Sequence, residues 1–207
     1  MNRRDYLSIM NELSASEGVF TTAQAMRLGI PRNVLAKARQ AGKLVRIAHG
    51  AYRMAGTPAS QLDELTAAWK LTDPAKMTHE RVPVDAWDGI AVAGNTASIL
   101  GIGDFYLSPY RILAPRRINS RNVETRFGVR DISRNEVSFA SGIPVTSIER
   151  TLVDLVLDGE DPSLVEDALS DAREKGLDEE RLIRLAADAG ASAQAKRKMA
   201  RIFGEEA

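Results

Sequence analysis

Apolar residues recur along the chain with two periods, one typical of helices and one typical of strands. Tyr6, Ile9, Met10 and Leu13 follow the i, i+3, i+4, i+7 spacing of one helix face, which predicts a helix over residues 3–14. Similar spacing predicts further helices over 22–28, 31–41, 60–72 and 96–100, and several from about residue 147 onward. The residues expected to cap these later helices are Ser60 with Asp63, Asn95, Thr146, Asp161, Asp178 and Ser192. Alternation of apolar and polar residues predicts strands at 44–47, 51–54, 111–115, 123–129, 137–139 and 143–145.

The segment from Gly18 to Arg53 combines these patterns in a short stretch. Thr21 and Gln24 have the spacing of a capping box, so a helix is expected to start there, and Gly29 is suited to end it. Pro31 favours the first turn of a second helix. Two strands joined by a short turn follow and predict a β-hairpin. Two short helices followed by a hairpin are typical of a winged helix-turn-helix.

The two helices differ in the residues that they turn outward. In the first helix we expect Ala23 and Met26 to face inward, with Ala25 and Leu28 as further candidates. In the second helix we expect Val34, Leu35 and Ala38 to face inward. The outward face of the second helix is then polar and cationic, and the hairpin adds further cations. The candidates for contact with DNA are Thr22, Arg32, Asn33, Lys37, Gln40, Arg46, His49 and Arg53.

These residue types suit the chemistry of the DNA grooves. An α-helix fits the major groove, where arginine pairs with guanine and asparagine or glutamine pairs with adenine. The alternative is a charged helix face that is simply solvated or that contacts a protein. Residues 1–57 contain nine Lys or Arg and three Asp or Glu, a local net charge of +6 in a chain whose total is zero. This excess favours DNA as the partner.

A second basic block lies in the middle of the chain. Residues 111–134 contain seven arginines and two acidic residues, whereas residues 149–207 have a net charge of −6. Two interpretations of the block remain open. Its arginines either pair with the acidic helices that follow, or form a second surface for phosphates or a partner protein. The candidate residues for that surface are Arg116, Arg117, Arg121 and Arg126.

The sequence contains no convincing pattern for catalysis, a metal or a cofactor. The chain has no cysteine, and its two histidines, His49 and His79, are far apart in sequence and have no His or Cys neighbour. The glycines between Gly94 and Gly103 lack the Lys-Ser/Thr of a phosphate-binding loop. We therefore expect a protein that is not an enzyme, without metal or cofactor. The absence of cysteine, of a long apolar run and of a signal peptide leads us to expect a cytoplasmic protein without a membrane segment.

Ala55-Gly56-Thr57-Pro58 is the best candidate for a linker, because glycine and proline interrupt the pattern where the local charge changes sign. The expected fold class is α+β. A winged helix-turn-helix domain over residues 1–57 precedes a mixed α/β domain over 58–207, which contains a small antiparallel or mixed sheet and is helical from about residue 147. Residues 73–92 predict no clear element.

With these residues in view, the chain resembles the AbiEi-type antitoxin family of type IV toxin–antitoxin systems. The resemblance is carried by the pattern from Gly18 to Arg53 and, more loosely, by four later stretches. These are Asn95-Thr96-Ala97, Leu100-Gly101-Ile102-Gly103-Asp104, the arginine-rich strand that follows, and the segment from Ile143 to Leu155. In many related proteins a nuclease-like extension follows, and we do not carry it over to this chain.

The resemblance implies a transcriptional autorepressor that also acts as an antitoxin. Its winged helix would bind double-stranded DNA at inverted repeats in the promoter of its own operon. Its C-terminal domain would counter a toxin of the nucleotidyltransferase type. The alternatives are a plain winged-helix regulator, or a protein-interaction module without a toxin partner.

Overall fold

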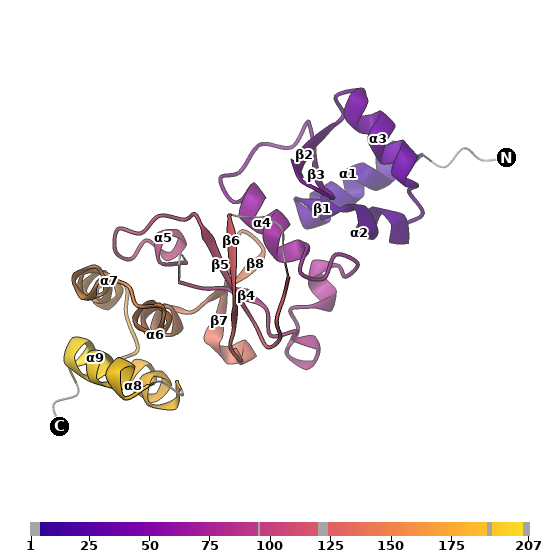
Figure 1. The fold of residues 1–207 in the computed structure, drawn as a ribbon. Coiled ribbons are helices and arrows are strands. Elements are labelled where there is room, and N and C mark those ends of the chain that lie inside the picture. The colour runs from indigo at the N-terminus through magenta and orange to yellow at the C-terminus, as the bar shows by residue number, and fades with distance from the viewer. Residues whose placement is uncertain (1–4, 95, 120–123, 190–191, 205–207) are drawn as a thin grey trace. The chain divides into compact units, whose positions relative to one another are not determined.

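The computed structural model describes residues 5–94, 96–119, 124–189 and 192–204. The chain forms two compact units. Unit 1 comprises residues 1–88 together with 141–143, and unit 2 comprises residues 89–140 and 144–207. Helices and a small sheet make up unit 1, whereas a larger mixed sheet and C-terminal helices make up unit 2 (Figure 1). The expected α+β class with a winged helix-turn-helix followed by a mixed domain is confirmed.

Unit 1 begins with three helices and a three-stranded antiparallel sheet in the order β1-β3-β2. The turn at residues 49–50 joins β2 to β3, as the hairpin pattern predicts. One core lies beneath the helices and holds Met10, Leu13, Phe20, Ile30 and Leu35, among others. The elements are α1 (Tyr6–Glu17), β1 (Phe20–Thr21), α2 (Thr22–Arg27), α3 (Arg32–Gln40), β2 (Leu44–Ala48) and β3 (Ala51–Met54).

Local capping explains where α2 begins. The Thr21 hydroxyl accepts a hydrogen bond from the Gln24 amide at 3.0 Å, and the Gln24 carboxamide accepts one from the Thr21 amide at 2.8 Å. The predicted capping box is therefore confirmed. The inward face of α2 differs from the expectation at two positions, because Met26 is 45% exposed and Gln24 is buried, whereas Ala25 is buried as its place on the apolar face allowed. Gln24 can be buried because its side-chain amide also donates to the Lys76 carbonyl at 2.8 Å.

Helix α4 (Asp63–Lys70) belongs to the same compact unit as the winged helix. It begins without a side-chain cap, so the expected capping box of Ser60 and Asp63 is wrong. Lys70 and Glu17 of α1 form a buried ion pair, with side chains 3% and 4% exposed. Burial lowers the pKa of Lys70. Burial opposes ionisation of Glu17, but Lys70 and Thr78 hold its pKa below the ordinary value.

The segment after α4 contains two short 3-10 helices and closes unit 1. They are η1 (Thr78–Glu80) and η2 (Val84–Ala86). Arg81 is 1% exposed, and its guanidinium carbon lies 3.8 Å from the centre of the Trp69 ring. Its Nε donates to Asp88 at 2.6 Å. A buried arginine, rather than a periodic apolar pattern, thus organises the stretch for which the sequence predicted no clear element.

Unit 2 contains a five-stranded mixed sheet in the order β6-β5-β4-β8-β7. Strand β4 pairs antiparallel with β5 and parallel with β8, while β5 pairs parallel with β6. Ser141 and Gly142 both have positive φ, which suits a two-residue hairpin turn between β7 and β8. The strands are β4 (Ala91–Val92), β5 (Tyr110–Ala114), β6 (Thr125–Val129), β7 (Val137–Ala140) and β8 (Ile143–Thr146), and the 3-10 helix η3 (Arg134–Glu136) precedes β7.

Five helices of unit 2 share one apolar core, and four of them form the C-terminal helical region (Figure 1). Asp161, Asp178 and Ser192 cap three of them, as predicted. The cap of the helix after β8 is Ser147, one residue later than the expected Thr146. A cap expected at Asn95 lies outside the described residues. The helices are α5 (Thr96–Leu100), α6 (Ile148–Asp158), α7 (Pro162–Glu174), α8 (Glu179–Asp188) and α9 (Ala193–Phe203).

Candidate nucleic-acid interface

Helix α3 turns two polar stripes away from the core of unit 1. Leu35 and Ala38 are buried at 1% and 8% exposure and fix which side of the helix faces inward. Arg32, Ala36 and Arg39 follow at helical spacing and line an open hollow beside the helix. The neighbouring stripe is also exposed and consists of Asn33, Lys37 and Gln40.

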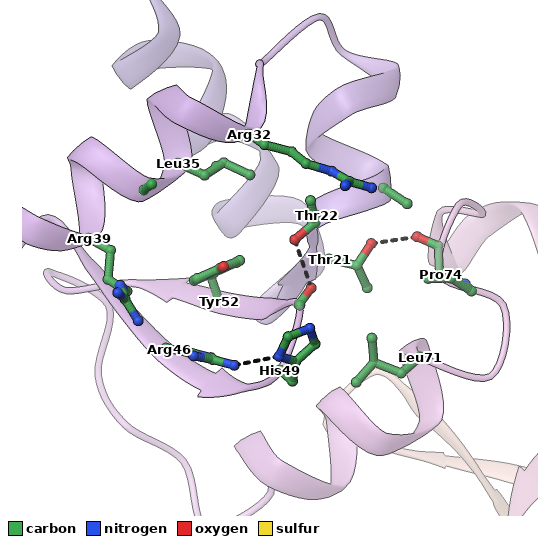
Figure 2. Close-up of a pocket in the computed structure, with 13 residues that line it drawn as sticks. Thr21, Thr22, Arg32, Leu35, Arg39, Arg46, His49, Tyr52, Leu71 and Pro74 are labelled. Atoms are coloured by element: carbon green, nitrogen blue, oxygen red, sulfur yellow. Dashed lines mark hydrogen bonds between the residues drawn. The ribbon is translucent and has the colours of Figure 1, made fainter. Parts of the chain in front are cut away.

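The hollow lies between α3, the start of α2 and the β2–β3 hairpin, and has a volume of about 520 Å³. Figure 2 shows Arg32, Arg39 and Arg46 at its border and Tyr52 toward its centre. None of its lining residues is acidic. They are Thr21, Thr22, Ala23, Arg32, Leu35, Ala36, Arg39, Arg46, His49, Gly50, Tyr52, Leu71 and Pro74.

Two neutral groups of the hairpin hold the Arg46 side chain in place. Arg46 Nη2 lies 2.7 Å from His49 Nδ1, and Arg46 Nε donates to the Ala48 carbonyl at 3.3 Å (Figure 2). Since a guanidinium has only donors, His49 Nδ1 is the acceptor in this contact and its hydrogen lies on Nε2. Both side chains are exposed. Arg46 therefore keeps its full positive charge at the surface.

Two residues from beyond the hairpin complete the hollow. Leu71 follows α4, and the Pro74 carbonyl accepts a hydrogen bond from the Thr21 hydroxyl (Figure 2). Thr22 is half-buried, and its hydroxyl donates to the Gly50 carbonyl at 3.3 Å. The start of α2 is thus tied to both the hairpin turn and the segment after α4.

The structure brings together four of the residues singled out from the sequence, Thr22, Arg32, Arg46 and His49, around this one hollow. Arg39 was missed, although its spacing of seven residues from Arg32 places it on the same helix face. Leu71 and Pro74 were missed as well, because no local pattern connects them with the hairpin.

Arg53 does not lie on the surface of unit 1. Its side chain is 9% exposed, and its Nε lies 2.9 Å from the Asp63 carboxylate at the start of α4. Its guanidinium also donates to the Thr57 carbonyl. A buried arginine that is already paired is unavailable to DNA, so this placement removes Arg53 from the candidate interface.

Five of the described arginines of the basic block in unit 2 form two groups. Arg111 and Arg130 form ion pairs with carboxylates of α6. Arg111 lies 2.9 Å from Asp158. Arg130 lies 2.6 Å from Asp158 and 3.0 Å from Asp154. These two follow the interpretation of pairing with the acidic helices. Arg116, Arg117 and Arg126 are exposed, and no described residue forms an ion pair with them. Arg121 lies outside the described residues.

Two other kinds of site are absent from the described part of the chain. No group of three or more His, Asp or Glu residues there is placed to hold a metal ion. No described helix is both long and apolar enough to cross a membrane.

Comparison with known proteins connects unit 1 with a family of regulators. Residues 8–55 match the sequence model of the family described as "Transcriptional regulator, AbiEi antitoxin". No curated protein sequence matches the chain. The crystal structure of the RV2827C protein from Mycobacterium tuberculosis is similar, with a TM-score of 0.59 at 17% identity over 96% of this chain and 76% of that one. At this identity the likeness shows the fold alone. The match confirms, for residues 8–55, the resemblance to AbiEi-type antitoxin regulators that the sequence indicated.

Proposed function

We propose that the protein is a DNA-binding transcriptional autorepressor and the antitoxin of a toxin–antitoxin operon. The observation that carries the DNA-binding part is the α3 surface, where exposed polar and cationic side chains border a hollow without acidic residues. Helix α3 lies within residues 8–55, the segment that matches the sequence model of a family described as transcriptional regulators. The proposed ligand is double-stranded DNA at inverted repeats in the protein's own promoter.

Within this proposal, the first turns of α3 contact base edges. Arg32 and Asn33 occupy the first turn and are exposed, which suits bonds to guanine and adenine in the major groove. Lys37 lies one turn later and Gln40 at the end of the helix, on the stripe with Asn33. Arg46 and His49 extend the contact from the hairpin, and Thr22 supports it at the start of α2.

A gel-shift titration with DNA from the region upstream of the gene tests this part. We expect binding whose log affinity falls steeply with log salt concentration, because lysines and arginines displace counterions from phosphates. Arg32→Ala should cost roughly 1–3 kcal/mol on that DNA and relax the preference for it over an unrelated duplex. Lys37→Ala should weaken binding in the same titration.

The matched control is Arg173→Ala, which removes an exposed arginine of α7 that pairs with Glu179 at 2.7 Å. It should bind DNA like the parent. If the Arg32→Ala/Lys37→Ala double variant also binds like the parent, the assignment of α3 as the recognition helix is wrong. If the parent binds no DNA at low salt and co-purifies with another protein, unit 1 is a protein-interaction module instead.

The antitoxin part of the proposal rests on the family description and names a nucleotidyltransferase-type toxin as the target. Within unit 2, the exposed residues Arg116, Arg117 and Arg126, with Arg121, supply the second surface for phosphates or a partner. We further propose that residues 1–57 and 58–207 act as the DNA-binding and antitoxin parts. The protein is proposed to work in the cytoplasm and without catalysis.

Co-expression with the neighbouring nucleotidyltransferase-like gene tests the antitoxin role. The parent should restore growth of cells that express the toxin, and Arg32→Ala/Lys37→Ala should still restore it if the toxin is countered through unit 2. Arg116→Glu/Arg117→Glu should lose rescue if the second surface takes part, whereas Arg173→Ala should keep it. Absence of rescue by the parent would leave a plain regulator.

A further inference from the structure

The hollow beside α3 contains arginine side chains beyond those proposed to contact base edges. Its border carries Arg39 and Arg46 in addition to Arg32, and its lining also includes the apolar residues Leu35, Leu71 and Pro74. We propose that this hollow seats one sugar–phosphate unit of the DNA backbone, with Arg39 and Arg46 as the phosphate ligands. This inference rests on the proposed DNA-binding function and assigns a site and a residue, Arg39, that the sequence did not single out.

The charge balance of the hollow favours an anion. Three arginines line it, and no lining residue is acidic. Among the described residues, Arg39 has no ion-pair partner, and the bonds of Arg46 go to a carbonyl and a neutral imidazole nitrogen. A polar cavity in unit 2 differs in this respect, because Asp158 and Glu160 line it together with its arginines. An excess of uncompensated guanidinium groups is what a phosphate site requires.

The shape of the hollow favours a ligand with an apolar part beside its charge. Tyr52 presents carbon surface between the arginines, and Leu71 and Pro74 add carbon surface on the opposite side of the hollow from Arg39 (Figure 2). A deoxyribose ring exposes carbon atoms next to its phosphate and matches this arrangement. The volume of about 520 Å³ lies within the range of roughly 300–1,000 Å³ typical of small-ligand sites, so one nucleotide unit fits without closure of the protein around it.

The two arginines come from different elements that border the same space. Arg39 lies near the end of α3 and Arg46 on β2, so one phosphate between them would connect the recognition helix with the hairpin. His49 acts as a positioning residue, because its Nδ1 accepts from Arg46 and orients the guanidinium. Phosphate contacts of this kind fix the register of a protein on the duplex and carry no sequence information.

The test compares Arg39→Ala, Arg46→Ala and the control Arg173→Ala on two duplexes, one from the upstream region and one of unrelated sequence. Affinities are measured between 50 and 200 mM salt. Each hollow variant should bind both duplexes about tenfold more weakly, with an unchanged ratio between them. The slope of log affinity against log salt should become less steep by about 1 for each. Arg39→Lys should recover most of the slope, because it restores the charge.

Three results would overturn the inference. They are an unchanged affinity for both duplexes, a loss confined to the upstream duplex, which would indicate base contact, or an unchanged salt slope. Because Arg39 and Arg46 are exposed, the variants should keep the parent's thermal unfolding midpoint. The inference can fail while the proposed function stands, since the parent would still bind DNA through α3. If the parent shows no salt-dependent DNA binding, both fail.

Discussion

The buried pair of Lys70 and Glu17 provides the sharpest test of how α4 supports the DNA-binding unit. Glu17 is the last residue of α1, and its carboxylate accepts hydrogen bonds from Lys70 and from the Thr78 hydroxyl, the latter at 2.6 Å. Lys70→Met keeps the length of the side chain but removes its charge. The change leaves a buried carboxylate without its counter-ion, because both side chains are almost fully enclosed.

The expected cost is about 3–5 kcal/mol, the usual penalty for removing one partner of a buried ion pair. This is a large part of the roughly 5–15 kcal/mol that stabilises a typical domain. Replacing both residues, as Glu17→Leu/Lys70→Met, should restore most of the loss, because no unpaired charge remains. The control Lys76→Met alters an exposed lysine that lies 3.5 Å from Asp73 and should cost less than about 0.5 kcal/mol.

The penalty should also depend on pH. In the parent, the pKa of Glu17 lies below its ordinary value, so the carboxylate contributes stability above the unfolded value of 4.5 that is lost as pH falls through the lowered pKa. In Lys70→Met, burial without Lys70 raises the pKa of Glu17, so the folded variant binds a proton more readily than the unfolded chain does. The difference between parent and variant should therefore shrink as the pH falls toward 4.

Urea unfolding followed by tryptophan fluorescence measures this effect in the full chain. The chain has two tryptophans, Trp69 and Trp87, and both lie in unit 1, so the signal reports on that unit. Lys70→Met should move the midpoint down by about 2 M urea, given a typical slope of roughly 1–3 kcal/mol/M. A variant within about 1 kcal/mol of the parent at pH 7 would refute the conclusion that α4 supports unit 1 through this pair.

Two further predictions concern the folding of each unit. Gly128→Ala should destabilise unit 2 by about 1–3 kcal/mol, because the added Cβ would lie 2.6 Å from Leu113 Cδ2 and 2.8 Å from Arg111 Nη2. Thermal unfolding followed by circular dichroism measures the loss. Gly56→Ala is the control because open space surrounds Gly56, and equal stability of the two variants would contradict the packing argument. A fragment of residues 1–88 should unfold cooperatively in urea, whereas a fragment of residues 1–57 should not. The shorter fragment lacks Lys70 and Asp63, which are the ion-pair partners of Glu17 and Arg53. Cooperative unfolding of the shorter fragment would instead support the domain boundary predicted at residue 57.

Local patterns in the sequence were sufficient to predict most of the helices and the hairpin. The capping box of Thr21 and Gln24 needs only residues three positions apart, so it is visible in the sequence and present in the structure. The same holds for Asp161 followed by Pro162 at the start of α7. These features depend on interactions within one turn of the chain, which the sequence contains in full.

The predictions fail where a side chain finds its partner far along the chain. Met26 was expected in the core, but Gln24 takes the inward position because the Lys76 carbonyl lies there to accept its hydrogen bond. Arg53 was expected at the surface, but Asp63 pairs with it in the interior of unit 1. The amino-acid type of Gln24 or Arg53 does not reveal such a partner, because the hydrogen bond or ion pair forms only when another segment lies next to the side chain.

The candidate interface shows the same division. The amino-acid sequence by itself determined that α3 and the hairpin would be short, adjacent and cationic, because helix spacing and local charge are properties of neighbouring residues. Only the tertiary structure decided that Arg39 and Arg46 border one hollow, that Leu71 and Pro74 complete it, and that Arg53 is absent from it. The reason is physical: burial and charge pairing depend on which surfaces meet in space, and those surfaces come from segments that are distant in the chain.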